Sequence, residues 1–124
     1  MNPTLEEGEF VYVSLPADPA SGGLPDAAIC IFREEEGITL IVRREESERR
    51  GFPSTFPCRM ITLNVVSDLA AVGFLARVAT ELAAHNISVN AVSAYHHDYL
   101  FVPVRDAEKA LDVLRRLTQL SALP

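Results

Sequence analysis

Several features are scarce or missing in this sequence of 124 residues, and each absence argues against a class of protein. No apolar run approaches the roughly 18 residues that a membrane-spanning helix requires. Residues 1–10 lack a basic segment followed by an apolar core, so no signal peptide is predicted. We therefore expect a cytoplasmic protein with no membrane partner, built as one compact domain or as two small intertwined halves.

Positive charge is also scarce. Lys and Arg number 11 against 17 Asp and Glu, which gives a formal net charge of −6. Nucleic-acid binding needs basic side chains directed at phosphates, and no basic stripe is present, so this composition argues against a nucleic-acid partner. Hydrophobic residues make up 48% and charged residues 23%, as in a globular protein that can bury a core.

Cysteine is limited to Cys30 and Cys58, which lie far apart and outside any C-x-x-C or Cys/His pattern. In a cytoplasmic chain such residues are expected to be reduced and buried, since a free Cys packs as a small hydrophobic residue. We predict neither a disulfide nor a metal site from them.

Motifs of known catalytic sites are missing as well. The chain has no G-x-S-x-G elbow and no G-x-x-x-x-G-K-[ST] phosphate loop. Cys58 has no His near it in sequence, although a spatial partner stays open. We expect a protein without catalytic activity, cofactor or metal.

The first half of the chain reads as a small β unit. Aromatic and β-branched residues predict strands over 9–15, 28–33 and 38–43, with residues 1–8 loosely docked. Three prolines and two adjacent glycines make 16–27 a loop, and three consecutive Glu residues followed by Gly37 suit a hairpin turn. The remaining segments are a charged helix or turn at 44–51 and a stiff connector with two Phe-Pro pairs at 52–58.

The second half has the order strand, helix, strand, strand, helix. Its predicted elements are strands at 59–66, 87–95 and 99–104 and helices at 69–85 and 107–120. The first helix is expected to follow a cap at Ser67 or Asp68 and to end at His85 and Asn86. Its expected buried stripe consists of Leu69, Val72, Leu75, Ala79, Leu82 and Ala83.

This order supplies five of the six elements of a ferredoxin-like βαββαβ unit. The final strand is missing, and either the strand at 9–15 or a partner chain could fill its place. We predict an α+β fold with two ferredoxin-like halves in tandem, antiparallel sheets and helices on one face. The predicted division is 1–58 for a degenerate N-terminal half and 59–124 for a regular C-terminal half.

The turn from residue 67 to residue 74 has the character of a ligand-binding corner. The first turn of a helix exposes free N–H groups and the positive end of the helix dipole, which suits a carboxylate. Gly73 is expected inside the helix, where Gly costs about 1 kcal/mol relative to Ala. Either a ligand or a second chain approaches closely there, or the helix packs tightly on its own sheet.

The segment 61–104, ITLNVVSDLAAVGFLARVATELAAHNISVNAVSAYHHDYLFVPV, resembles an ACT domain in its order, its "SDLAAVG" corner and its "HNISVNAVSAY" strand. The whole chain is similar to small bacterial proteins built from two ACT-like halves, the first degenerate. It departs from the frequent "DxPG" approach, because Ala70, Ala71 and Val72 precede Gly73.

The resemblance implies a regulatory domain that binds a small effector, usually an amino acid, where ACT units meet, as in a homodimer. It places the effector corner on Ser67, Asp68, Leu69, Val72, Gly73 and Phe74, and the facing strand on Ile87, Ser88, Val89 and Asn90. With no catalytic domain in the chain, any regulated partner would be a separate protein.

Polar side chains in and around this corner distinguish ligand binding from simple packing, because polar groups buried without partners are costly. We expect Asp68 to hold the ammonium group of an amino acid while helix N–H groups hold its carboxylate. The complete predicted ligand set is Asn64, Ser67, Asp68, Leu69, Val72, Gly73, Phe74, Ser88 and Asn90.

Two alternatives stay open. The chain could be an interaction module that dimerises through its ACT-like sheets without a ligand. A metal or acid–base site could also form from His96, His97 and Asp98 with the flanking tyrosines, since His and Asp are good ligands for zinc or iron. Adjacent His residues on an extended segment point to opposite faces, which argues against the metal site.

Overall fold

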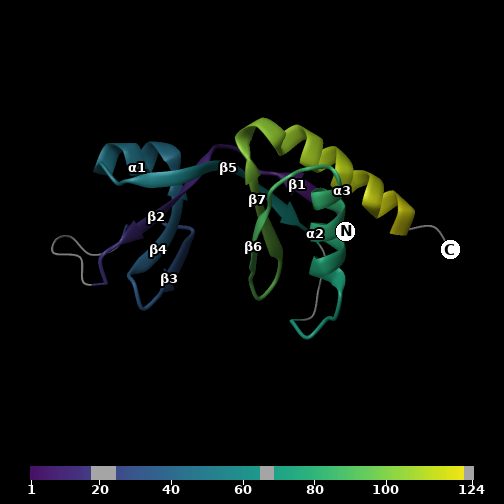
Figure 1. The fold of residues 1–124 in the computed structure, drawn as a ribbon, viewed down its shortest axis with the longest axis horizontal. Coiled ribbons are helices and arrows are strands. Elements are labelled where there is room, and N and C mark those ends of the chain that lie inside the picture. The colour runs from purple at the N-terminus through teal and green to yellow at the C-terminus, as the bar shows by residue number, and fades with distance from the viewer. Residues whose placement is uncertain (18–24, 65–68, 122–124) are drawn as a thin grey trace. The chain divides into compact units, whose positions relative to one another are not determined.

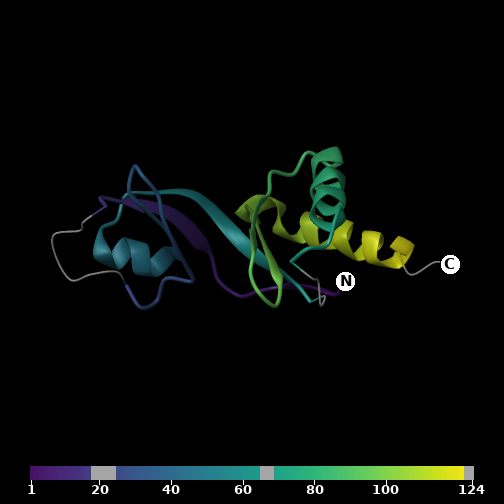
Figure 2. The same ribbon diagram turned by 90° about the horizontal axis from the view of Figure 1, so that it is seen from below.

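The computed structural model divides the chain into two compact units (Figures 1 and 2). The N-terminal unit is Gly8–Pro57, and the C-terminal unit combines Met1–Glu7 with Cys58–Pro124. The residues that the structure describes are 1–17, 25–64 and 69–121.

The N-terminal unit is an antiparallel sheet with one short helix. The strands follow the order β3-β4-β2-β5. Its elements are β2 (Phe10–Leu15), β3 (Cys30–Arg33), β4 (Ile38–Arg43), α1 (Arg44–Arg50) and the start of β5 (Ser54–Leu63). The three strands predicted from aromatic and β-branched residues are therefore confirmed, and the charged segment predicted as a helix or turn is a helix.

Alternating side chains build the core of this unit. Val13 lies opposite Leu40 and Val11 opposite Val42, and all four side chains are buried on one face of the sheet. The hairpin turn after β3 closes through a hydrogen bond from the Glu34 N–H to the Gly37 carbonyl (2.8 Å). A Cβ at Gly37 would stand 2.4 Å from the Leu15 carbonyl oxygen, so this close approach of two backbones requires Gly.

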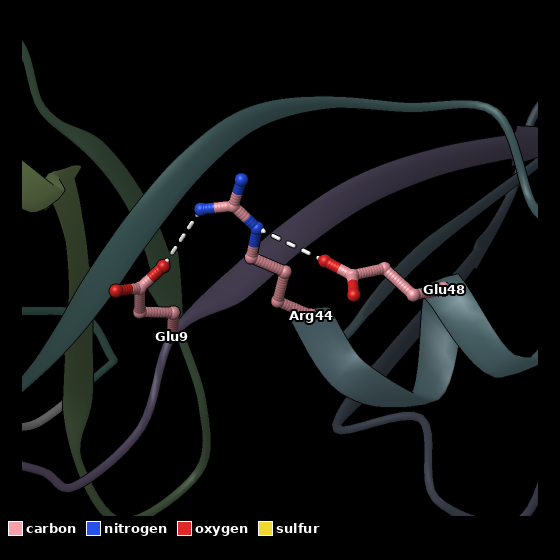
Figure 3. Close-up of polar contacts among 3 residues, drawn as sticks. All are labelled: Glu9, Arg44 and Glu48. Atoms are coloured by element: carbon pink, nitrogen blue, oxygen red, sulfur yellow. Dashed lines mark hydrogen bonds and ion pairs between the residues drawn. The ribbon is translucent and has the colours of Figure 1, made fainter.

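Charged side chains connect helix α1 to the start of β2. The Arg44 N–H donates to the Glu9 carbonyl over 2.9 Å. The Arg44 guanidinium lies 2.8 Å from Glu9 Oε1 and 3.3 Å from Glu48 Oε1 (Figure 3). The hydrogen bond to Glu9 and the charge of Glu9 raise the pKa of Arg44 above its ordinary value. A helix of seven residues is too short to be stable alone and depends on such tertiary contacts.

The C-terminal unit has the same strand arrangement with more helix. The order is β6-β7-β5, and β1 pairs with β5. Its other elements are β1 (Pro3–Leu5), α2 (Phe74–Ala84), β6 (Asn90–Ser93), β7 (Asp98–Pro103), the 3₁₀ turn η1 (Val104–Asp106) and α3 (Ala107–Ser121). The expectation that residues 1–8 are loosely docked is wrong, because residues 3–5 form the strand that the second half was missing.

The core of this unit lies between the sheet and the two helices. Ile61 and Leu63 of β5 share a face with Leu100 and Val102 of β7, and all four are buried. Helices α2 and α3 lie side by side against this face (Figures 1 and 2). They contribute Val78, Leu82, Ala110, Val113, Leu114 and Leu117 to the core.

Several predicted element boundaries are wrong, and the strand predicted over 87–95 is limited to Asn90–Ser93. Helix α2 begins at Phe74 instead of residue 69, so Leu69 and Val72 are exposed and do not belong to its buried stripe. The predicted connector 52–58 contains the start of β5, since Ser54 already belongs to that strand. Only the second Phe-Pro pair, Phe56 and Pro57, lies within β5, and Pro can occupy a strand where no ladder N–H is needed.

Candidate ligand-binding corner

The corner follows β5 at the end of the C-terminal unit's sheet. Leu63, the last residue of β5, lies opposite Asp98, the first residue of β7. The corner therefore lies at the same end of the sheet as the hairpin between β6 and β7. Ser67 and Asp68 lie outside the described residues, so their predicted contacts with an effector stay predictions.

Gly73 precedes helix α2 and has a φ of 92°, in the left-handed region that favours Gly. The premise that Gly73 lies within the helix is wrong, and its backbone angle accounts for the residue. No atom lies within 4 Å of a Cβ placed at Gly73, so the space above it is open among the described residues. Neither a close neighbour nor tight packing on the sheet is found there.

Helix α2 begins without a side-chain cap. Its first intrahelical bond runs from the Arg77 N–H to the Gly73 carbonyl over 3.0 Å. Within the described part of the chain, no side chain caps the helix, and its first turn contains no acidic residue. The N–H groups of Phe74, Leu75 and Ala76 precede that first bond and have no helical carbonyl partner. This arrangement can accept an anionic group at the open side of Gly73.

Apolar side chains surround the same end of the unit. Leu69 is 65% exposed, Val72 is 99% exposed and Tyr95, in the β6–β7 hairpin, is 78% exposed. The Tyr95 ring meets the His96 ring edge to face at 4.9 Å. A group of exposed large apolar side chains is typical of a surface that contacts a ligand or another protein.

Asn64, which follows β5 and precedes the corner, is connected to strand β1. Its Nδ2 donates to the Asn2 carbonyl over 2.9 Å and to Thr4 Oγ1 over 2.7 Å. These two contacts occupy both N–H groups of the amide, which holds β1 against β5. Only Oδ1 of Asn64 then remains as an atom with which this side chain could receive a ligand.

Ser88 and Asn90 lie at the other end of the unit. Asn90 begins β6 opposite Phe101, whereas Ser93 ends β6 opposite Asp98 at the level of the corner. Within one C-terminal unit, the structure therefore does not bring Ser88 and Asn90 together with Gly73 and Phe74. They could face an effector corner only when that corner belongs to another unit.

Asp98 is a residue of this corner that the ligand set missed. It is 6% exposed, which is unusual for a carboxylate, and it begins β7 instead of lying in the hairpin turn. Strand pairing with Leu63 and Ser93 is what places it there. In the sequence, only the predicted strand order indicates this position, because the strand that follows the β6–β7 hairpin pairs with β5 and so begins beside its end.

The described residues give little support to a metal site or to a nucleophilic cysteine. Among the described residues, no group of three His, Cys, Asp or Glu side chains could hold a metal ion. Cys58 is fully buried, as expected, and burial raises the pKa of its thiol to about 12, which makes it a poor nucleophile. Cys30 is half-buried at the edge strand β3, and both thiols are free.

Comparison with known protein families gives two matches in tandem. One ACT domain model matches residues 1–59, and a second ACT domain model matches residues 55–116. The chain therefore belongs to the ACT domain family and contains two ACT-like halves in tandem. The predicted bounds of the halves, 1–58 and 59–124, stay a prediction. A comparison with curated proteins finds no match.

Solved structures agree with this assignment. A protein of unknown function from Vibrio cholerae, described as a possible transport protein, is 37% identical, with 93% of this chain and 88% of that chain covered and a TM-score of 0.80. A protein from Agrobacterium tumefaciens is 19% identical, with 92% and 86% covered and a TM-score of 0.74. The regulatory subunit of aspartate kinase from Thermus flavus is 11% identical, with 94% and 96% covered and a TM-score of 0.64.

The last two likenesses show the fold, and they confirm the tandem ferredoxin-like architecture of ACT type. As a class, ACT domains are regulatory modules that generally bind small-molecule effectors and oligomerise, and membership of the family supports a regulatory, ligand-binding role in general for this chain. None of the helices in the described part of the chain has the length and apolar character of a membrane span.

Proposed function

We propose that this chain is a cytoplasmic sensor that binds an amino acid and has no catalytic activity of its own. In this proposal it works as a homodimer and regulates a separate protein. The observation that carries the proposal is the N-terminus of helix α2, which follows Gly73 and has no side-chain cap among the residues that the structure describes. A free carboxylate matches both the first N–H groups of the helix, which have no helical carbonyl partner, and the positive end of the helix dipole.

The ammonium group of an amino acid needs an acidic partner near the same helix end. In the proposal this partner is Asp68, the second residue of the corner. Leu69, Val72 and Tyr95 then form the apolar surroundings that an amino acid side chain would contact. Because these side chains are largely exposed in a single chain, we expect a second copy to cover the bound effector.

Thermal unfolding in the presence of each of the twenty amino acids tests this proposal. A ligand that binds only the folded protein at about 100 times its Kd adds roughly 2.7 kcal/mol to stability. For a chain of this size the melting temperature should rise by several degrees. A panel without any shift would contradict amino acid sensing.

A matched pair of variants locates the effect. Asp68→Ala should abolish the ligand-dependent shift and leave the melting temperature without ligand nearly unchanged. Asp112→Ala removes the same charge from an exposed position of α3 and should keep the full shift. If Asp68→Ala also keeps the shift, Asp68 is not the ammonium partner.

A second candidate function is an interaction module that dimerises without a ligand. Three exposed apolar side chains on and beside the edge strand β3 favour it: Ile29, Ile31 and Phe32 are 45%, 44% and 65% exposed. An edge strand offers unpaired N–H and C=O groups to another chain. Light scattering separates the two functions, since a pure module should have the same mass with and without amino acids and should gain no thermal stability from them.

A further inference from the structure

The C-terminal unit contains a second candidate site, far from the corner. A hollow of about 400 Å³ opens where helix α2 ends and helix α3 begins. One wall is the end of α2 and the segment that leads to β6, and the other wall is the turn η1. The residues that line it are Ala83, Asn86, Ile87, Ser88, Arg105 and Asp106.

The two walls are held in place by the core and by one cross-connection. Asn86, with a φ of 59°, ends α2 in the left-handed conformation, and the next residue, Ile87, is buried. On the other side, Ala107 is buried directly after η1. Lys109 Nζ of α3 donates to the His85 carbonyl at the end of α2 over 2.9 Å. Because both walls are anchored, the hollow is preorganised instead of forming only around a ligand.

Opposite charges lie next to one another in this hollow. Arg105 Nε is 3.9 Å from Asp106 Oδ2, at the outer limit of an ion pair, and the Arg105 side chain is 83% exposed while that of Asp106 is 20% exposed. Within the described residues, the Arg105 side chain makes no other hydrogen bond or ion pair. A guanidinium has five N–H donors, so most of its donors remain available to a ligand.

Polar side chains complete the lining. Asn86 and Ser88 are exposed and make no side-chain hydrogen bond to any other described residue. The hollow therefore presents a cation, a carboxylate, an amide and a hydroxyl within one concave surface. A free α-amino acid carries a carboxylate, which complements the charge of Arg105, and an adjacent ammonium group, which complements the charge of Asp106.

We infer that this hollow binds a small zwitterion of the α-amino acid type. Arg105 pairs with the carboxylate of the ligand, and Asp106 accepts hydrogen bonds from its ammonium group. Asn86 and Ser88 bond to the remaining polar atoms. This site does not depend on the corner at Gly73, and a ligand can occupy either one alone.

The two sites lie at opposite ends of the same elements. The corner is at the start of α2 and beside the start of β7, and the hollow is at the end of α2 and beyond the end of β7. Eleven helical residues span about 16 Å and six strand residues about 20 Å, so one small molecule cannot bridge the two sites within a unit.

Backbone amide NMR spectra of the full chain distinguish the sites. The probes are the twenty L-amino acids, sodium acetate as the anionic half alone and methylammonium chloride as the cationic half alone, all at constant ionic strength. We expect at least one amino acid to shift the amides of Asn86, Ser88 and Arg105, with acetate and methylammonium binding more weakly. Arg105→Gln should weaken this binding by about tenfold or more, since hydrogen bonds to a charged group are lost.

Arg115→Gln is the matched control, because it removes the same charge from another exposed arginine, on α3 outside the hollow. It should leave the affinity unchanged. Shifts confined to Gly73 and Phe74 would overturn the second site while supporting the corner, and an absence of shifts at both places would overturn both. Equal affinity in Arg105→Gln and Arg115→Gln, or acetate binding as tightly as the amino acid, would overturn the assignment of a zwitterion to Arg105 and Asp106.

Discussion

The two units have equivalent strands but differ in their helices. The order β3-β4-β2-β5 of the N-terminal unit matches the order β6-β7-β5-β1 of the C-terminal unit, strand for strand. The described residues between β2 and β3 contain no helix, whereas α2 connects β5 to β6. Strand pairing alone is thus enough to define the architecture. Both candidate sites lie at the ends of α2, so the functional features belong to the element that differs.

Equivalent positions of the two hairpins show the same contrast. The register places Ile38 of β4 opposite Leu15, and Asp98 of β7 opposite Leu63. Both Ile38 and Asp98 are buried. A carboxylate where the other unit has an isoleucine is costly in a core, because a buried charge needs partners. The C-terminal unit therefore carries a polar residue at its corner that the fold by itself does not require.

The largest difference in unfolding free energy between the units should appear when a buried side chain of helix α2 is truncated. Leu82 of α2 is fully buried in the C-terminal core, and Leu82→Ala should lower the free energy of unfolding by about 2–5 kcal/mol because it leaves a cavity. Ile31 lies on β3, which no helix of comparable length covers among the described residues, and it is 44% exposed. Ile31→Ala should cost about 1 kcal/mol or less. Urea unfolding of both variants measures the two values.

Equal losses for the two variants would contradict the comparison. A small loss at Leu82 would mean that α2 does not seal the core, and a large loss at Ile31 would mean that β3 is covered. Leu120→Ala is a useful reference in the C-terminal unit, because Leu120 is 62% exposed and its truncation should resemble that of Ile31.

The second prediction concerns the alkaline pH dependence of stability, which we expect to depend on Cys58 of the C-terminal unit. The Cys58 thiol has its pKa raised by burial from 9.0 to about 12. Above pH 9 the unfolded chain loses this proton while the folded chain keeps it, so stability should fall as pH rises from about 9 toward about 12. The expected slope is about 1.4 kcal/mol per pH unit, or about 2 kcal/mol by about pH 10.5. Below pH 9 this residue should have no effect on the pH dependence.

Unfolding by urea at several alkaline pH values measures this slope. Cys58→Ala should reduce the slope by the stated amount, whereas Cys30→Ser, at the half-buried edge position, should keep it. The same slope in all three proteins would show that the Cys58 thiol does not stay protonated in the folded chain.

Much of the fold could be predicted from residue patterns, and the failures have physical causes. Runs of aromatic and β-branched residues identified β2, β3 and β4, and the core of that unit comes from β2 and β4. Strand β1 has only three residues, and its partners are far away in the sequence, as Pro3 pairs with Leu63. No local pattern signals such a pairing. The start of α2 was misplaced because Leu69 and Val72 fit helical spacing, although the angle at Gly73 begins the helix later.

The candidate sites were harder to predict than the fold. Gly73 could be singled out from the sequence, although the reason given for it was wrong. Ser88 and Asn90 were assigned to the same site as Gly73, but the direction of β6 separates them within a unit. The hollow combines residues 83–88 with residues 105–106, which meet only because α2 and α3 pack together. The spacing of these residues in the sequence gives no indication that the two segments lie next to each other in the fold.

The smallest expected effects come from two glycines, one in each unit. Gly51 after α1 has a φ of 68° and Gly73 before α2 has a φ of 92°, and among the described residues no atom lies within 4 Å of a Cβ added at either position. Each Gly→Ala change should therefore cost about 1 kcal/mol through backbone strain alone. Only Gly73→Ala should also reduce the melting-temperature shift caused by an amino acid, because the added methyl group occupies the open side of the α2 N-terminus. If both variants lose stability equally and keep the full shift, the effector does not bind at the corner.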